Sequence, residues 1–220
     1  MRNLILIFAE MIICYISLII LYKKYKTDGI YVYGIIFTFI SCIMSLKKID
    51  IMNVDIPIGF ATTTSIIVGG NLITQKRGLD ELKTYIILIL LTVLISSCFL
   101  NLSGLIEVSK YNEIANKSFD NIFKYNLRVY IALIVSLIGS CFISSKIYYS
   151  LKKLQNQVLF CNVFSIIIVE LFENLLFVLI AYLFEYKIVN LILCIVIRYM
   201  IKTIIGTIGT IPIAILKKVN

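Results

Sequence analysis

Apolar residues in this chain form long continuous runs that are separated by short polar connectors. Several runs reach the roughly 20 residues that a helix needs to cross a bilayer. The runs lack the strict alternation over about 10 residues that is typical of membrane β-barrel strands. The pattern therefore predicts seven helical spans, at residues 4–22, 29–46, 57–74, 83–106, 126–149, 158–184 and 188–216.

The polar residues between the runs predict where individual spans begin and end. Asp55 is placed to cap the third span, and Pro57 would lie in its first turn, where a missing N–H costs little. Gly78 is suited to end the same span. The longest polar connector runs from Glu107 to Lys124, after the fourth span. Because the chain has only two prolines and no Gly/Ser-rich linker, we expect one transmembrane domain over residues 1–220.

Composition supports an integral membrane protein. Of the 220 residues, 60% are hydrophobic and 15% are charged, whereas a soluble domain has about 25% charged residues. The predicted fold class is an all-α integral membrane protein, a bundle of six to seven transmembrane helices, with the lipid bilayer as its surroundings. The first span has a long apolar run and no small-residue cleavage site after it, which favours a retained helix over a signal peptide.

The net charge of +9 indicates topology rather than a nucleic-acid partner. The denser Lys/Arg clusters follow spans one, three and five and recur in the C-terminal tail, although Lys47 and Lys48 also follow span two. Basic clusters in short connectors mark the cytoplasmic side. We therefore expect a multi-pass protein of the cell membrane, with its N-terminus outside and its C-terminus in the cytoplasm, and no nucleic-acid binding.

Several chemistries are absent from the sequence. There is no histidine, and the six cysteines are scattered singly over six different spans without a CxxC pair. This distribution argues against a metal site, a disulfide framework and a histidine base. No Walker A motif is present, so the chain does not hydrolyse ATP by that route. We expect no cofactor, no metal and no enzymatic activity.

Two acids and two bases lie near the middle of the last two spans. Glu170 and Glu173 belong to the sixth span, and Arg198 and Lys202 to the seventh. A charge at the centre of a bilayer costs about 2.5 kcal/mol or more, so it persists only when it is paired or faces a polar cavity. The first interpretation is an interior site on a solute pathway. The alternative is that the charges only hold two helices together, although desolvation roughly cancels the attraction of such pairs.

The sixth span carries the most specific set of side chains. Glu170, Glu173, Asn174 and Phe177 follow the i, i+3, i+4, i+7 spacing and therefore share one helix face. That face offers carboxylate acceptors, an amide and an aromatic plane. Such a set suits a flat heterocycle with adjacent N–H donors, as in a guanine-like ring.

The seventh span places Arg198 and Lys202 four residues apart on one face. Lys202 would neutralise a glutamate while the site is empty. Arg198 either faces this site or extends along the helix toward the headgroups. Gly206 and Gly209 would let neighbouring backbones approach closely.

Polar residues of the third and fifth spans are further candidates. Asn71, Thr74 and Gln75 lie toward the inner end of the third span, where they either bind substrate or make ordinary interhelical hydrogen bonds. Arg128, at the outer end of the fifth span, either closes a binding cavity or anchors at the headgroups.

Four segments together resemble the vitamin uptake transporter (VUT), or queuosine precursor transporter, family. The segment 71–78, NLITQKRG, is similar to the family's acidic-led segment, and the segment from Ser165, SIIIVELFENLLFVLIAY, is similar to its signature span. The segment 199–216, YMIKTIIGTIGTIPIAIL, is similar to the family's last span, with a lysine, Lys202, ten residues before a proline, Pro212. The opening LYKKYKTDGIYVY is similar to the family's first loop and second span.

This resemblance implies uptake of 7-deazaguanine precursors of the tRNA nucleoside queuosine. The substrate-binding residues that it implies are Asn71, Thr74, Gln75, Arg128, Ser165, Glu170, Glu173 and Lys202. The chain departs from the family pattern at several of its positions. Asn71 and Gln75 stand where the family usually has acids, Glu173 where it has Asp, Asn174 where it has Thr, and Ser144 where an Asp is common.

The side chains of the last two spans and the family resemblance together support one hypothesis, with two alternatives. A deazapurine enters from outside, Glu173 and Glu170 accept hydrogen bonds from its N–H edge, Phe177 stacks on it, and Lys202 balances charge in the empty state. One alternative is a substrate-binding membrane subunit of a multi-component vitamin transporter. The other is a non-transporting membrane assembly protein. The expected partner is a small heterocyclic molecule, and a homo-oligomer is compatible with the sequence.

Overall fold

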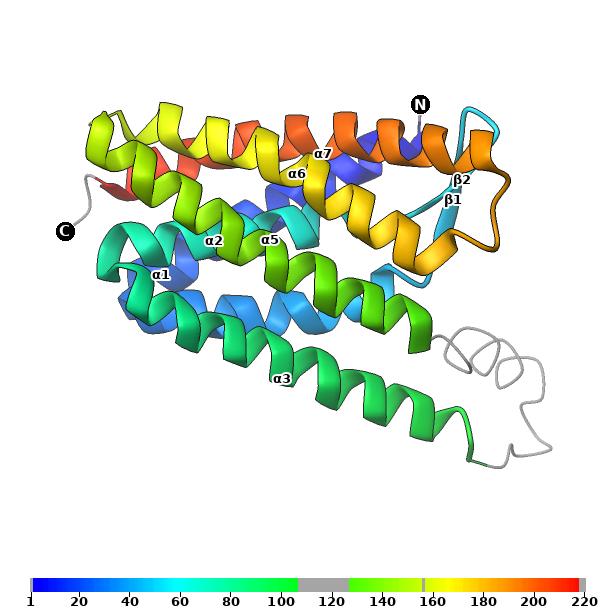
Figure 1. The fold of residues 1–220 in the computed structure, drawn as a ribbon. Coiled ribbons are helices and arrows are strands. Elements are labelled where there is room, and N and C mark those ends of the chain that lie inside the picture. Colours follow the sequence, from blue (N-terminus) through cyan, green and yellow to red (C-terminus); the bar gives the residue numbers. More distant parts are fainter. Residues whose placement is uncertain (1, 107–126, 156, 218–220) are drawn as a thin grey trace.

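The computed structural model describes residues 2–106, 127–155 and 157–217. Its elements follow in the order α1 (Arg2–Met44), β1 (Lys48–Ile51), β2 (Val54–Pro57), α2 (Phe60–Arg77), α3 (Leu79–Ser103), α5 (Leu127–Leu154), α6 (Val158–Tyr182) and α7 (Ile188–Lys217) (Figure 1). In this part of the chain five helices are long and apolar enough to span a membrane, namely α1, α3, α5, α6 and α7. The predicted all-α membrane class is confirmed.

Helix α1 is two arms joined at a sharp kink. Lys26 has φ 53° and ψ −131°, a backbone conformation that does not occur inside an α-helix. Figure 1 shows the two arms running in opposite directions. The turn is tight, because a Cβ at Gly29 would overlap the carbonyl of Leu21. The arms correspond to the first two predicted spans, residues 4–22 and 29–46.

A β-hairpin follows α1, in a segment for which no strand was predicted. Strands β1 and β2 pair antiparallel from Lys48↔Pro57 to Ile51↔Val54. Met52 and Asn53 both have positive φ, 58° and 60°, as a two-residue type I′ turn requires. The alternation in KIDIMNVDIP is a strand signal, but it was hidden between the end of one apolar run and the start of the next.

The hairpin changes the start of the third predicted span. Pro57 ends β2 instead of lying in the first helical turn, and Asp55 lies in β2 and does not cap α2. The N-cap is Gly59, with φ 96° and no side-chain hydrogen bond to the helix. At the other end the prediction is confirmed, because the N–H of Gly78 donates to the carbonyl of Thr74 at 3.1 Å.

The remaining helices agree with the predicted spans to within a few residues. Helix α3 begins at Leu79, before the predicted residue 83, and α5 continues to Leu154, beyond the predicted 149. Helix α6 ends at Tyr182 and α7 at Lys217, both close to the predicted ends. The predicted connector from Glu107 to Lys124 and the predicted first residue of span five, Asn126, lie outside the described residues.

Helix α2 is the central helix of the bundle. Every residue from Phe60 to Thr74 is buried, and α2 contacts α1, α3, α5, α6 and α7. It begins inside the bundle, directly after β2 (Figure 1). Because protein rather than lipid surrounds it, α2 tolerates the threonines, serine and asparagine that the lipid-facing helices avoid.

Small residues allow α7 to approach its neighbours closely. A Cβ at Gly206 would overlap the side chain of Ile166, and a Cβ at Gly209 would overlap the Tyr15 hydroxyl. That hydroxyl donates to the carbonyl of Ile205 at 3.1 Å. Side chains of α6 and α1 therefore fill the space that Gly206 and Gly209 leave, while the predicted close approach of backbones stays a prediction.

The two ends of the bundle differ in character. At one end lie the kink at Lys26, the α2–α3 turn, the α5–α6 junction and the C-terminal end of α7 (Figure 1); we call this the basic end, because the connectors there carry the denser Lys/Arg clusters. The β-hairpin and the α6–α7 turn lie at the opposite end, the hairpin end. The clusters thus gather at one end, as a single cytoplasmic side would require.

Candidate functional site

A buried charge cluster joins α6 and α7. The ammonium of Lys202 lies 2.5 Å from Glu173 Oε2 and 2.9 Å from Glu170 Oε2. These three side chains are at most 1% exposed. The i, i+3 spacing of the glutamates turns both toward α7, and Gly206, one turn beyond Lys202, lets the two helices approach. With Arg198, the cluster has two acids and two bases and is formally neutral.

Arg198 completes the cluster through two hydrogen bonds and one ion-pair contact. Nε donates to Asn174 Oδ1 at 3.0 Å, Nη1 donates to the Pro57 carbonyl at 3.0 Å, and Nη2 lies 3.9 Å from Glu173 Oε2. The side chain is 2% exposed. Of the two interpretations left open by the sequence, snorkelling to the headgroups is therefore wrong.

Two aromatic rings flank the Arg198 guanidinium. Its Cζ lies 4.5 Å from the centroid of Phe177 and 5.6 Å from that of Phe60. Both rings are buried. Phe177 was a sequence candidate, whereas Phe60 was missed because it looked like an ordinary apolar residue of the third span. Cation–π contacts of this kind strengthen when water is excluded.

Some acceptors of the cluster remain unused. Glu170 Oε2 is in ion-pair contact with Lys202, but neither oxygen of Glu170 has a hydrogen-bond partner of good geometry among the described residues. The Thr64 hydroxyl, on the facing α2, is buried and lies close enough to interact with Glu170, but no hydrogen bond of good geometry joins the two. Buried polar atoms are usually hydrogen-bonded, so a group of unsatisfied ones marks a place where a ligand or water can bind.

Asn71 belongs to a different and more complete polar network. Its Nδ2 donates to Ser165 Oγ at 3.1 Å, while its Oδ1 accepts from Ser144 at 3.0 Å and from Ser145 at 3.4 Å. Ser165 in turn donates to the carbonyl of Asn162 at 2.9 Å. Asn71 thus ties α2 to α5 and α6, which is the interhelical alternative considered for it.

Thr74, Gln75 and Arg128 lie away from the charge cluster. Thr74 donates to the Gly70 carbonyl of its own helix at 3.0 Å. The Gln75 amide oxygen is buried without a partner in the described chain. Arg128 donates to the Ile180 carbonyl at 2.6 Å. Within the described residues no hydrogen bond or ion pair joins any of the three to Glu170, Glu173 or Lys202.

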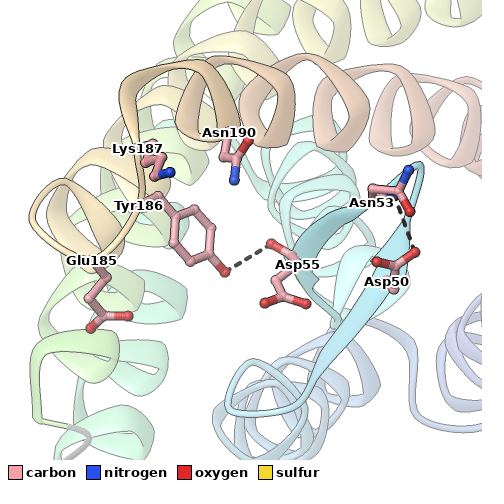
Figure 2. A pocket seen from close by; sticks show the side chains of 7 residues that line it. All are labelled: Asp50, Asn53, Asp55, Glu185, Tyr186, Lys187 and Asn190. Carbon is pink, nitrogen blue, oxygen red and sulfur yellow. Dashed lines mark hydrogen bonds between the residues drawn. The ribbon is translucent and has the colours of Figure 1, made fainter.

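A pocket of about 480 Å³ opens at the hairpin end. Sequence reasoning missed it, because it depends on the unpredicted hairpin. Figure 2 shows side chains from the hairpin on one side of the pocket and from the α6–α7 turn on the other. Its lining residues are Asp50, Asn53, Asp55, Glu185, Tyr186, Lys187 and Asn190.

Contacts across this pocket hold the hairpin to the α6–α7 turn. Tyr186 Oη donates to the Asp55 carbonyl at 2.9 Å (Figure 2), and Lys48 pairs with Glu185 at 3.4 Å. Burial raises the pKa of the Tyr186 hydroxyl above its usual range, so that it remains a protonated donor at neutral pH.

Stacked rings connect the pocket to the charge cluster. The Tyr186 ring stacks on Tyr182 with centroids 5.0 Å apart, and Tyr182 meets Phe177 edge-on at 6.2 Å. Phe177 in turn contacts Arg198. A continuous line of aromatic side chains therefore leads from the pocket to the buried charges.

Comparison with known protein families identifies the chain. Residues 57–216 match the model of the family described as "Putative vitamin uptake transporter". The chain belongs to this family. Comparison with curated proteins finds no match, and comparison with solved structures finds none either.

The vitamin uptake transporter match contains the whole charge cluster. It begins at Pro57, whose carbonyl accepts from Arg198, and it includes Phe60, the acids of α6 and the bases of α7. The resemblance to the vitamin uptake transporter family is thereby confirmed, and three of the four quoted segments lie inside the matched residues. The fourth segment, LYKKYKTDGIYVY at residues 21–33, precedes the matched region, so its resemblance stays a prediction.

Proposed function

We propose that this vitamin uptake transporter imports a 7-deazaguanine-type queuosine precursor through the α6–α7 site. The observation that carries the proposal is the partly unsatisfied acid pair, in which Glu170 is fully buried and has no hydrogen bond of good geometry. A ring with adjacent N–H donors supplies what these carboxylates lack. The family match supports transport, and the resemblance to the queuosine precursor transporters supports this substrate.

Binding requires an exchange at Lys202. In the ligand-free arrangement the ammonium lies against both glutamates. When the heterocycle enters, its N–H edge hydrogen-bonds with Glu173, and Lys202 remains with Glu170. The two carboxylates then keep one cation and gain neutral donors, so the buried charge changes little. This matters because an uncompensated buried charge is strongly unfavourable.

The route that we propose runs from the hairpin end to the basic end. Positive connectors lie on the cytoplasmic side of membrane proteins. In this orientation the protein lies in the cell membrane with its N-terminus outside and its C-terminus in the cytoplasm. Substrate then reaches the charge cluster from the hairpin end. The proposal includes no cofactor, no metal and no catalytic step, and it holds for a monomer or a homo-oligomer.

Import can be tested in cells that neither synthesise queuosine nor carry their own importer. The chain is expressed, low concentrations of 7-deazaguanine, its aminomethyl derivative or queuine are supplied, and queuosine in tRNA is read by boronate gel shift. We expect a shift that Glu173→Gln abolishes at equal expression and that the exposed-site control Glu81→Gln leaves unchanged.

No shift with any precursor, from protein inserted in the membrane, would overturn the substrate assignment. A shift that appears only when ATPase subunits are co-expressed would identify a substrate-binding subunit instead of a self-sufficient importer.

The close contact of Lys202 with both glutamates also favours a second candidate, a helix-locking protein that transports nothing. The two functions are separated by the double variant Glu173→Gln with Lys202→Met, which removes one acid and one base together. If the charges only lock α6 to α7, this balanced change preserves function. If Glu173 accepts the substrate, the folded double variant imports nothing.

A further inference from the structure

The environment of Arg198 is more specific than a helix-locking residue requires. Each of its three guanidinium nitrogens meets its own acceptor, on Asn174, Pro57 and Glu173. The rings of Phe177 and Phe60 flank its carbon. These acceptors and aromatic rings together form a binding site for a flat N–C–N group that carries several N–H donors.

The same unit occurs in a guanine-type ring. Its ring N–H and exocyclic amino group are joined through one carbon and lie in the plane of the ring, as in a guanidine. A heterocycle that carries this edge can therefore donate to the acceptors that now hold Arg198, and its flat ring can stack on the same phenylalanines.

We propose that Arg198 is a built-in placeholder for the guanidine-type edge of the substrate. In the ligand-free state its guanidinium occupies the subsite, and the ligand displaces it. This inference rests on the proposed function and deepens it, because it specifies the part of the heterocycle that is recognised. It assigns Asn174, Phe60 and the Pro57 carbonyl to the binding site, beside Glu173.

The placeholder has an electrostatic advantage. Glu173 Oε2 is 2.5 Å from Lys202 but 3.9 Å from Arg198, so the contact with Arg198 is the weaker of the two and is the easier one to give up. A further acceptor lies one ring away, because the Tyr182 hydroxyl is buried without a partner in the described residues and its ring contacts Phe177. The displaced guanidinium can therefore turn toward a second acceptor beside Phe177 and remain near the two acids.

Displacement also reaches the hairpin. The Pro57 carbonyl that accepts from Arg198 is the last one of β2. The chain then turns through Gly59, at φ 96°, into α2. A ligand that donates to the Pro57 carbonyl replaces the hydrogen bond between Arg198 and the hairpin. Ligand binding therefore changes the contacts that hold the hairpin.

The first test compares two probes that differ in one amino group. Binding of 7-deazaguanine and of 7-deazahypoxanthine, which lacks the exocyclic amino group, is measured on purified protein in nanodiscs. The wild-type chain is expected to bind 7-deazaguanine about tenfold or more tightly, because loss of the amino group leaves buried acceptors unpaired. Equal affinities would overturn this inference while leaving import in place, whereas binding of neither probe would overturn the proposed function as well.

The second test removes the placeholder. Arg198→Ala is expected to bind 7-deazaguanine more tightly than the wild type, about tenfold, because no internal group then competes for the subsite. Unchanged or weaker binding would overturn the placeholder role. If Arg198→Ala does not fold, Arg198→Lys serves, because it keeps the charge but cannot fill the fork; the same gain is expected.

A third pair of variants locates the subsite. Asn174→Leu is expected to reduce the affinity for 7-deazaguanine to that for 7-deazahypoxanthine, since it removes the acceptor of the guanidine-type edge. Phe164→Leu is the matched control, because Phe164 is an exposed residue of α6 that stacks on Phe160. A preference for 7-deazaguanine that survives in Asn174→Leu would overturn the assignment.

Discussion

Two buried polar networks in this transporter look alike in the sequence but differ in how completely they are satisfied. The Asn71 network uses both ends of its amide, with hydrogen bonds to three serines on α5 and α6. In the charge cluster, Glu170 has no hydrogen bond of good geometry among the described residues. A satisfied network fixes one arrangement of helices, whereas an unsatisfied one has capacity left for a ligand.

The comparison assigns different tasks to the two networks. Asn71 holds the central helix α2 to its neighbours, and we expect its loss to affect stability. Glu170, Glu173, Arg198 and Lys202 hold charges that can exchange partners, and we expect changes there to affect transport as well.

The largest effect is expected from Lys202→Met alone. It leaves two buried carboxylates with one cation, Arg198, which lies 3.9 Å from Glu173 Oε2, and breaking a buried ion pair in this way costs about 3–5 kcal/mol. Thermal unfolding in detergent should show a large fall in midpoint. Adding Glu173→Gln to the same chain, which again balances one buried acid with one buried base, should recover part of the midpoint but no import. If Lys202→Met unfolded at the wild-type midpoint, Lys202 would not form the buried ion pairs with Glu170 and Glu173 described above.

Asn71→Leu should destabilise less, by about 1–3 kcal/mol, because it removes the acceptor of the Ser144 hydroxyl and the N–H that donates to Ser165 Oγ. Import per folded molecule should stay close to wild type, with an unchanged KM. The comparison between the two networks fails if KM rises at normal stability, because Asn71 would then contact the substrate, as the family resemblance implies.

The sequence was sufficient for the helices, because long apolar runs have few alternatives to membrane spans. It also placed Glu170, Glu173, Asn174 and Phe177 on one face, since helical spacing dictates this. The pairing of these residues with α7 followed from charge alone. Local pattern was therefore enough for half of the site.

The rest of the site depends on tertiary structure that no local pattern encodes. The hairpin brings the Pro57 carbonyl to Arg198. Every residue has a backbone carbonyl, so the amino-acid type does not reveal which carbonyl accepts from a side chain. Phe60 reads as an ordinary apolar residue until β2 places it beside the guanidinium. Asn71 was grouped with the substrate site, because polarity in a span does not reveal whether its partners are serines or a ligand.

Close packing of α7 provides a prediction of intermediate size. A Cβ at Gly209 would overlap the Tyr15 hydroxyl, whereas one at Gly139 would meet the Phe172 ring at 3.3 Å. Gly209→Ala should therefore cost about 1–3 kcal/mol of stability through overpacking, and the control Gly139→Ala clearly less. Thermal midpoints of the two variants, measured side by side, decide whether α7 is as tightly packed against α1 as described.

The smallest effect is expected at the hairpin end, where Lys48 and Glu185 form an ion pair at 3.4 Å with side chains 34% and 50% exposed. An exposed pair of this kind contributes about 0–1 kcal/mol and is screened by salt. Lys48→Gln should shift the thermal midpoint little, even though Lys48 also lies 4.4 Å from the Tyr182 ring. The exposed ion pair thus contributes less to stability than the buried ion pairs of the cluster. A loss of stability as large as that of Lys202→Met would show instead that the hairpin, and not α6 with α7, holds the bundle closed.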